Sequence, residues 1–110
     1  MITIELIYER DCPNVSEARS ELLLALSEVG LPLRWVEWER SDPDSPNYVK
    51  TYGSPTILVN GKDVAGINST GVASCCRLYV NESGKFKGAP HAAIIVKALR
   101  SALESEQTKM

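Results

Sequence analysis

A turn that contains a cysteine and a proline joins a strand-like segment to a helical one within the first 29 residues, and this turn constrains the fold most. Residues 2–7 alternate apolar with polar side chains, as a half-buried strand does. From residue 15 to residue 29 the apolar residues recur at spacings of three and four, which predicts a helix with one buried stripe. Gly30 and Pro32 predict its end. Cys12 therefore lies in the turn where the helix begins.

A thiol at a helix start has surroundings that favour its deprotonated form. Free backbone N–H groups and the positive end of the helix dipole both favour thiolate over thiol, so Cys12 is a candidate nucleophile or soft-metal ligand. Pro13 suits the first helical position, which predicts that Cys12 lies at or beside the N-cap. The alternative is a small buried residue that fills the turn, because cysteine is among the most buried residue types.

Length, charge and cysteine content limit the classes of protein that fit. A chain of 110 residues that is 44% hydrophobic predicts a single domain, residues 1–110, with one core. The net charge of −2 comes from interspersed charges, without the basic stripe that a nucleic acid partner requires. No apolar run is long enough to span a bilayer, Met1 leads directly into a strand, and three cysteines are too few for a disulfide scaffold. We therefore expect a cytoplasmic protein without a membrane partner, or one whose leader has been removed. The oligomeric state is left open.

The remaining segments predict further strands and helices. Residues 31–39 alternate as a strand does and place Trp35 and Trp38 on opposite faces, where both pack. Asn60-Gly61 predicts a tight hairpin, because both residues tolerate positive φ. The other expected elements are a short helix at about residues 46–52, hairpin strands at 56–59 and 62–65, a last helix at 90–104 and a C-terminal tail at about residues 105–110. The fold class is therefore α/β, in the order β-α-β-α-β-β-α.

This order is that of the thioredoxin-like proteins, and three short segments resemble thioredoxins and glutaredoxins. They are the turn at Cys12-Pro13, the segment Gly53-Ser54-Pro55-Thr56, and the hairpin at Asn60-Gly61 with Gly66 after it. The resemblance implies a four-stranded mixed sheet flanked by helices and a cis peptide bond between Ser54 and Pro55, beside the active cysteine. It also implies that Ser54, Pro55 and Thr56 bind a thiol or disulfide substrate, glutathione or a protein, and that no cofactor is needed.

Val15 marks a departure from that family. It occupies the position where a dithiol oxidoreductase carries the second cysteine of Cys-x-x-Cys, so only monothiol chemistry or a thiol from elsewhere remains.

The other thiols are Cys75 and Cys76, in an insertion at about residues 67–89 that contains a second, weaker hairpin. The strand after Asn60-Gly61 must return toward Pro55, and the insertion therefore starts at the rim of the Cys12 site. We expect at least one of these two thiols within disulfide or metal-bridging reach of Cys12. The alternative is that one packs inward and its neighbour outward, away from Cys12.

The three thiols also suit a soft metal. Cys12, Cys75 and Cys76 form a sulfur set without imidazole, which favours soft ions. In this respect the chain resembles small thioredoxin-like proteins grouped with mercury resistance and, more distantly, alkylmercury lyase. That resemblance implies that Cys12 with Cys75 or Cys76 holds mercury and that Asp11 delivers a proton. Otherwise Asp11 is only the negative charge that suits a helix start.

Three functions from different classes follow. The first is a thiol-based redox protein, a thiol-disulfide oxidoreductase that uses Cys12 with Cys75 or Cys76 as a partner thiol. The second is a soft-metal or organomercurial binding or lyase-like protein, and the third is a non-catalytic thioredoxin-fold binding module. His91, the only histidine, is a candidate base or an exposed residue of the last helix. Arg10 and Tyr8 flank the thiol turn and are candidates to bind an anionic substrate group.

Overall fold

The structure is a computed structural model that describes residues 2–66, 79–80 and 86–108. Its centre is a four-stranded sheet in the order β2-β1-β3-β4, and the predicted α/β class with a mixed sheet is confirmed. Strand β1 pairs parallel with β2 and antiparallel with β3, and β3 pairs antiparallel with β4. A separate two-stranded sheet joins β5 and β6. The strands are β1 (Ile4–Tyr8), β2 (Val36–Glu39), β3 (Thr56–Val59), β4 (Lys62–Asp63), β5 (Tyr79–Val80) and β6 (Phe86–Lys87).

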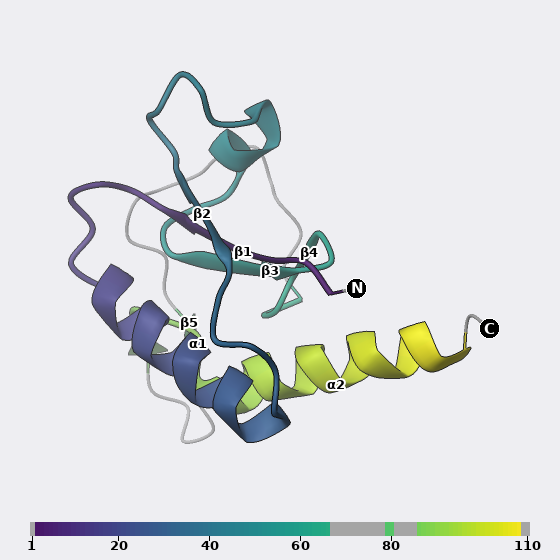
Figure 1. Ribbon diagram of the computed structural model, residues 1–110. Helices are drawn as coiled ribbons and strands as arrows, with labels where there is room; N and C mark the ends of the chain where they lie inside the picture. The colour runs from purple at the N-terminus through teal and green to yellow at the C-terminus, as the bar shows by residue number, and fades with distance from the viewer. Residues whose placement is uncertain (1, 67–78, 81–85, 109–110) are drawn as a thin grey trace.

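Both α-helices lie on one face of the four-stranded sheet (Figure 1). Helices α1 (Val15–Val29) and α2 (Ala92–Thr108) pack against each other and against the apolar side chains that β1 and β3 turn toward them. The fully buried members of this main core include Leu6, Leu22, Leu26, Ile95 and Leu99. The stripe that the sequence predicts for α1 is the side that α1 buries.

The opposite face of the sheet is covered as well. A 3-10 helix, η1 (Asn47–Thr51), places Val49 against Ile7 and Leu58, with Trp38 and Tyr52 packed around them. As a result β1 is buried on both faces, and even its Glu5 is only 7% exposed. The strand that the alternation in residues 2–7 predicts is confirmed, and its polar Glu5 is buried because η1 covers the second face of the sheet.

The start of α1 differs from the sequence expectation. The helix begins at Val15, with Asn14 at the N-cap, and Pro13 lies in the turn before it rather than at the first helical position. The N–H of Cys12 donates to the carbonyl of Glu9 at 3.0 Å, which closes a turn ahead of the helix. Cys12 therefore precedes the N-cap by two residues. The predicted end is confirmed, since Gly30 adopts a left-handed conformation with φ 84°.

The other elements follow the expected order with shorter strands. The helix expected at about residues 46–52 is the single 3-10 helix η1, so the described part of the chain has two α-helices rather than three. Residues 31–39 form a strand only over Val36–Glu39, with Trp35 on the helix side and Trp38 on the other, as expected. The tight hairpin is confirmed by positive φ at Asn60 and Gly61. The weaker hairpin appears as β5 and β6.

Helix α2 is longer than residues 90–104 and continues to Thr108. The segment expected to be a tail from about residue 105 thus joins the helix, because no glycine or proline follows Glu104 to stop it. Across the described residues, no helix combines the length and the apolar character that a bilayer span needs.

Candidate functional site

Cys12 lies in the turn between β1 and α1, next to the start of β3. Its side chain is 8% exposed, and its Sγ lies 3.8 Å from the carbonyl oxygen of Ser54. The peptide bond between Ser54 and Pro55 is cis, as the sequence predicts. The structure therefore brings Cys12 together with Ser54, which lies 42 residues further along the chain, and with Pro55 next to it.

The register between β1 and β3 explains this contact. Ile7 lies opposite Thr56, so the residues that follow β1 meet the residues that precede β3. Glu9 donates its backbone N–H to the hydroxyl of Ser54 at 2.8 Å, which fixes the start of the turn. Thr56 is buried and donates its hydroxyl to the carbonyl of Gly53 at 2.7 Å. Thr56 therefore braces the segment that holds Ser54 and Pro55.

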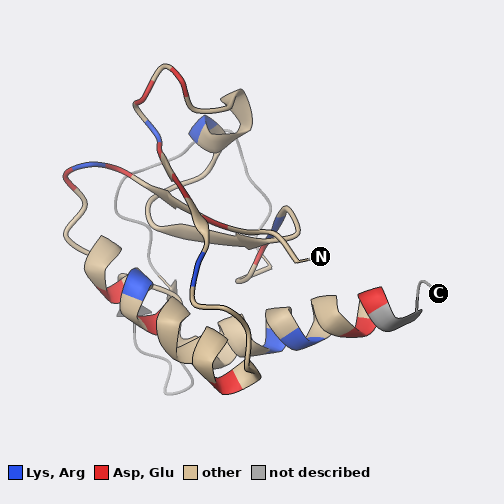
Figure 2. Ribbon diagram, in the orientation of Figure 1, with Lys and Arg blue, Asp and Glu red and all other residues tan. Residues whose placement is uncertain are grey.

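A carboxylate from the other neighbouring strand holds the same turn. Glu39, at the end of β2, is 9% exposed and accepts the backbone N–H of Arg10 at Oε2 and that of Ser41 at Oε1, each at 3.0 Å. Glu9 accepts a hydrogen bond from Arg40 at 3.2 Å and one from the Ser41 hydroxyl at 2.7 Å. Figure 2 shows acidic residues on β2 and both signs of charge in the turn that follows β1. Sequence reasoning missed these two glutamates, because neither has a local signal.

The segment before α2 closes the site from the helix side. Ala89 is buried and belongs to the same apolar cluster as Cys12 and Val15. Gly88 lies so close to the N-cap of α1 that an added Cβ would be 2.2 Å from Cγ of Asn14. The turn that carries Cys12 therefore packs against residues about 75 positions away along the chain.

The insertion contacts the site through β5. Tyr79 is buried, and its hydroxyl donates a hydrogen bond to the carbonyl of Pro55. This contact places a residue of the insertion at the segment beside Cys12. Cys75 and Cys76 lie outside the described residues, and their approach to Cys12 stays a prediction.

His91 caps the last helix. It precedes the first residue of α2, and its Nδ1 accepts the backbone N–H of Ala93 at 3.1 Å while its carbonyl accepts that of Ile94 at 3.0 Å. His91 lies just before the helix rather than one residue inside it, and it is exposed.

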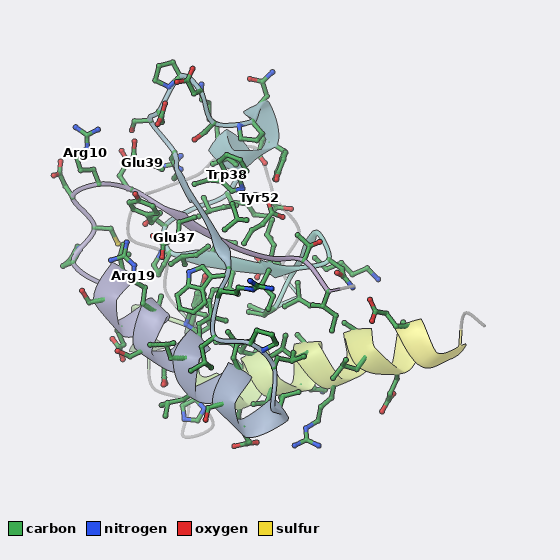
Figure 3. All side chains as sticks on the ribbon, in the orientation of Figure 1. Arg10, Arg19, Glu37, Trp38, Glu39 and Tyr52 are labelled. Atoms are coloured by element: carbon green, nitrogen blue, oxygen red, sulfur yellow. The ribbon has the colours of Figure 1, made fainter. Side chains whose placement is uncertain are left out.

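Arg10 and Asp11 are both exposed. In Figure 3 the side chain of Arg10 points away from the sheet into solvent, whereas Arg19 reaches from α1 toward Glu37 on β2. Two hydrogen bonds join Arg19 to Glu37, at 2.9 and 2.8 Å, and this hydrogen bonding lowers the pKa of Glu37 below its usual value. The guanidinium of Arg19 also lies 5.5 Å from the centre of the Tyr8 ring. Tyr8 thus packs against α1.

Two surface grooves flank the C-terminal half of α2, at the opposite end of β1 from Cys12. Lys62 and Asp63 border a groove of about 530 Å³ beside the small residues of α2. A second groove, of about 380 Å³, is more apolar and includes Ile2, Leu31 and Leu103. Neither groove includes Cys12.

The soft-metal set predicted from the sequence depends on residues that the structure does not describe. Among the described residues, no three His, Cys, Asp or Glu side chains are grouped so that they could hold a metal ion. Cys12 is a free cysteine. A metal site at Cys12 would need Cys75 or Cys76.

Comparison with protein-family models, with curated proteins and with solved structures finds no match for this chain.

Proposed function

We propose that this chain is a thioredoxin-like thiol protein whose Cys12 exchanges with a disulfide, either glutathione disulfide or a protein disulfide. The observation that supports it most is the position of Sγ of Cys12, 3.8 Å from the Ser54 carbonyl that precedes the cis peptide bond at Pro55. Ser54 and Pro55 are fully buried and the Pro55 carbonyl accepts the Tyr79 hydroxyl, so a disulfide substrate reaches Cys12 only when this segment opens.

The proposed reaction is one exchange step. The Cys12 thiolate attacks one sulfur of the disulfide, the original sulfur–sulfur bond breaks, and the second sulfur leaves as a thiolate with the bonding electron pair. The product is a mixed disulfide between Cys12 and one half of the substrate. Val15, at the position of a resolving cysteine, is a core residue 6% exposed. Release of the product therefore needs a second thiol from the substrate, from free glutathione, or from Cys75 or Cys76.

The wild type and two variants test this proposal. We expect a Cys75→Ser/Cys76→Ser double variant treated with glutathione disulfide to gain the mass of one glutathionyl group, because Cys12 remains. The Cys12→Ser variant should gain none at equal exposure to the reagent. Modification of Cys12→Ser alone would move the exchange chemistry to the insertion, and a lack of modification in all three proteins would refute the proposal.

The soft-metal and binding-module functions stay hypotheses from the sequence, and the same variants separate them. Mercuric ion bound tightly at one equivalent by the wild type, and more weakly by both variants, would support a site that combines Cys12 with the insertion thiols. Thiols that react with neither reagent would favour the binding module.

A further inference from the structure

The turn that carries Cys12 is held from two sides by side chains of neighbouring strands. After β1 ends at Tyr8, the next two backbone N–H groups have no strand partner, and each is accepted by a side chain. The N–H of Glu9 donates to the hydroxyl of Ser54, which precedes β3, and the N–H of Arg10 donates to the carboxylate of Glu39 on β2. Cys12 follows two residues later, and its own N–H returns to Glu9.

Glu39 is the stronger of the two supports. Hydrogen bonds to a carboxylate are roughly twice as strong as those between neutral groups. Both oxygens of Glu39 accept backbone N–H groups at 3.0 Å, and its own carbonyl accepts the hydroxyl of Ser45 at 2.8 Å. No cation is paired with Glu39 among the residues that the structure describes. The carboxylate is therefore committed to backbone groups on either side of it.

We propose that Glu39 is a positioning residue for Cys12: it holds the Arg10 end of the turn so that the thiol stays beside the Ser54 carbonyl. The inference rests on the proposed exchange function of Cys12. Glu39 acts through the backbone of Arg10 and touches no reacting atom. Removal of the Glu39 carboxylate should loosen the turn, so that the Cys12 thiol, now 8% exposed, is exposed more often. The loosened thiol should also be misplaced for attack on a second sulfur.

If Glu39 positions Cys12, its replacement should change the alkylation rate and the disulfide-exchange rate of Cys12 in opposite directions. In the Cys75→Ser/Cys76→Ser background, Glu39→Gln should raise the rate of Cys12 alkylation by iodoacetamide and lower the rate of exchange with glutathione disulfide, each by about tenfold. This estimate corresponds to the loss of one hydrogen bond to a charged acceptor. Glutamine keeps the size of glutamate but has one accepting oxygen, so it can serve only one of the two N–H groups. If Glu39 only supports the fold, both rates should be unchanged or rise together.

Glu37→Gln is the matched control. It makes the same substitution two residues earlier on β2, removes one of the two oxygens that accept from Arg19, and does not alter a side chain that contacts the turn. Its two rates should match those of the parent within a factor of about two. Equal effects of Glu37→Gln and Glu39→Gln would overturn the proposal.

Amide hydrogen exchange in the parent protein provides a test that does not depend on the folding of Glu39→Gln. The N–H of Arg10 should exchange at least about tenfold more slowly than that of Asp11, which has no hydrogen-bond partner among the described residues. Equal rates at the two amides would refute the role of Glu39. A parent protein that shows no glutathione exchange but keeps the slow Arg10 amide would refute the proposed function alone.

Discussion

Gly88 is the residue at which one added methyl group should disturb the packing beside Cys12. A Cβ atom at Gly88 would lie 2.2 Å from Cγ of Asn14, 2.4 Å from its Nδ2 and 2.5 Å from its Oδ1. The φ of Gly88 is not positive, so the obstacle is space rather than backbone conformation. Overpacking of this kind costs about 1–3 kcal/mol, and the Gly→Ala change offsets about 0.4–1 kcal/mol of it by restricting the unfolded chain. The middle of the two ranges leaves a net destabilisation of about 1.3 kcal/mol for Gly88→Ala.

A double-mutant cycle with Asn14 tests the cause of that destabilisation. Asn14→Ala removes all three atoms that the methyl group would meet, and the Asn14 side chain makes no hydrogen bond that caps α1. In the Asn14→Ala background, Gly88→Ala should be neutral or stabilising by up to about 0.7 kcal/mol, which gives a coupling free energy of about 1.3–2 kcal/mol. The assay is urea denaturation followed by the fluorescence of the two tryptophans.

Gly66→Ala is the control for this cycle. Gly66 has φ 72° and no atom within 4 Å of the added Cβ, so its cost comes from the backbone and should not change with Asn14→Ala. A Gly88→Ala cost below about 0.5 kcal/mol would mean that the Asn14 side chain turns aside freely. A coupling free energy near zero would refute the reasoning from the close contact.

Two further predictions concern single side chains. Hydrogen bonding to the Glu5 carboxylate raises the pKa of Tyr48 to about 12, so the stabilisation that this bond gives should be complete below pH 10 and lost as the pH rises from 10 to 12. A tyrosinate absorbance step near pH 12 should disappear in Tyr48→Phe and move to lower pH in Glu5→Gln; an unchanged step in Tyr48→Phe would contradict the assignment. Leu26→Ala should lower the free energy of unfolding by about 2–5 kcal/mol, because Leu26 is fully buried. Leu24→Ala, at a 61% exposed position on the same helix, should cost less than about 0.5 kcal/mol in the same urea assay, and similar costs would contradict the assigned core face of α1.

The elements that the sequence predicts well depend on local signals. The apolar spacing of residues 15–29 is a property of one helix, and Gly30 ends that helix through its own left-handed conformation. The tight hairpin depends only on Asn60 and Gly61. In contrast, the predicted start of α1 is wrong, because the bond from the Cys12 N–H to the Glu9 carbonyl closes a separate turn before the helix. That bond cannot be inferred from the preference of Pro13 for a helix start.

The two sides of the candidate site differ in the same way. The contact of Cys12 with Ser54 and Pro55 could be predicted, because the family resemblance supplied the segment and the antiparallel pairing of β1 with β3 supplies the register. The contact of Glu39 with Arg10 depends on the parallel register in which Tyr8 lies beside Glu39. Parallel strands are joined by a long connection, here the one that contains α1. No residue of that connection fixes the register between β1 and β2 to a single position.

Two glutamates on strands are buried although the alternation of polar and apolar residues assigns them to solvent. Glu5 looks like the solvent side of β1, yet it is buried and accepts hydrogen bonds from the Trp38 indole on β2 and from the Tyr48 hydroxyl. The bond from Tyr48 joins η1 to the sheet. Glu39 is buried because it accepts the N–H groups of two turn residues. Burial of a carboxylate costs free energy unless hydrogen-bond donors surround it. Each of these two glutamates therefore holds the segments that donate to it in one arrangement. For Glu39 this segment is the turn that carries Cys12. A glutamate that the pattern assigns to solvent therefore positions the thiol for the proposed exchange reaction.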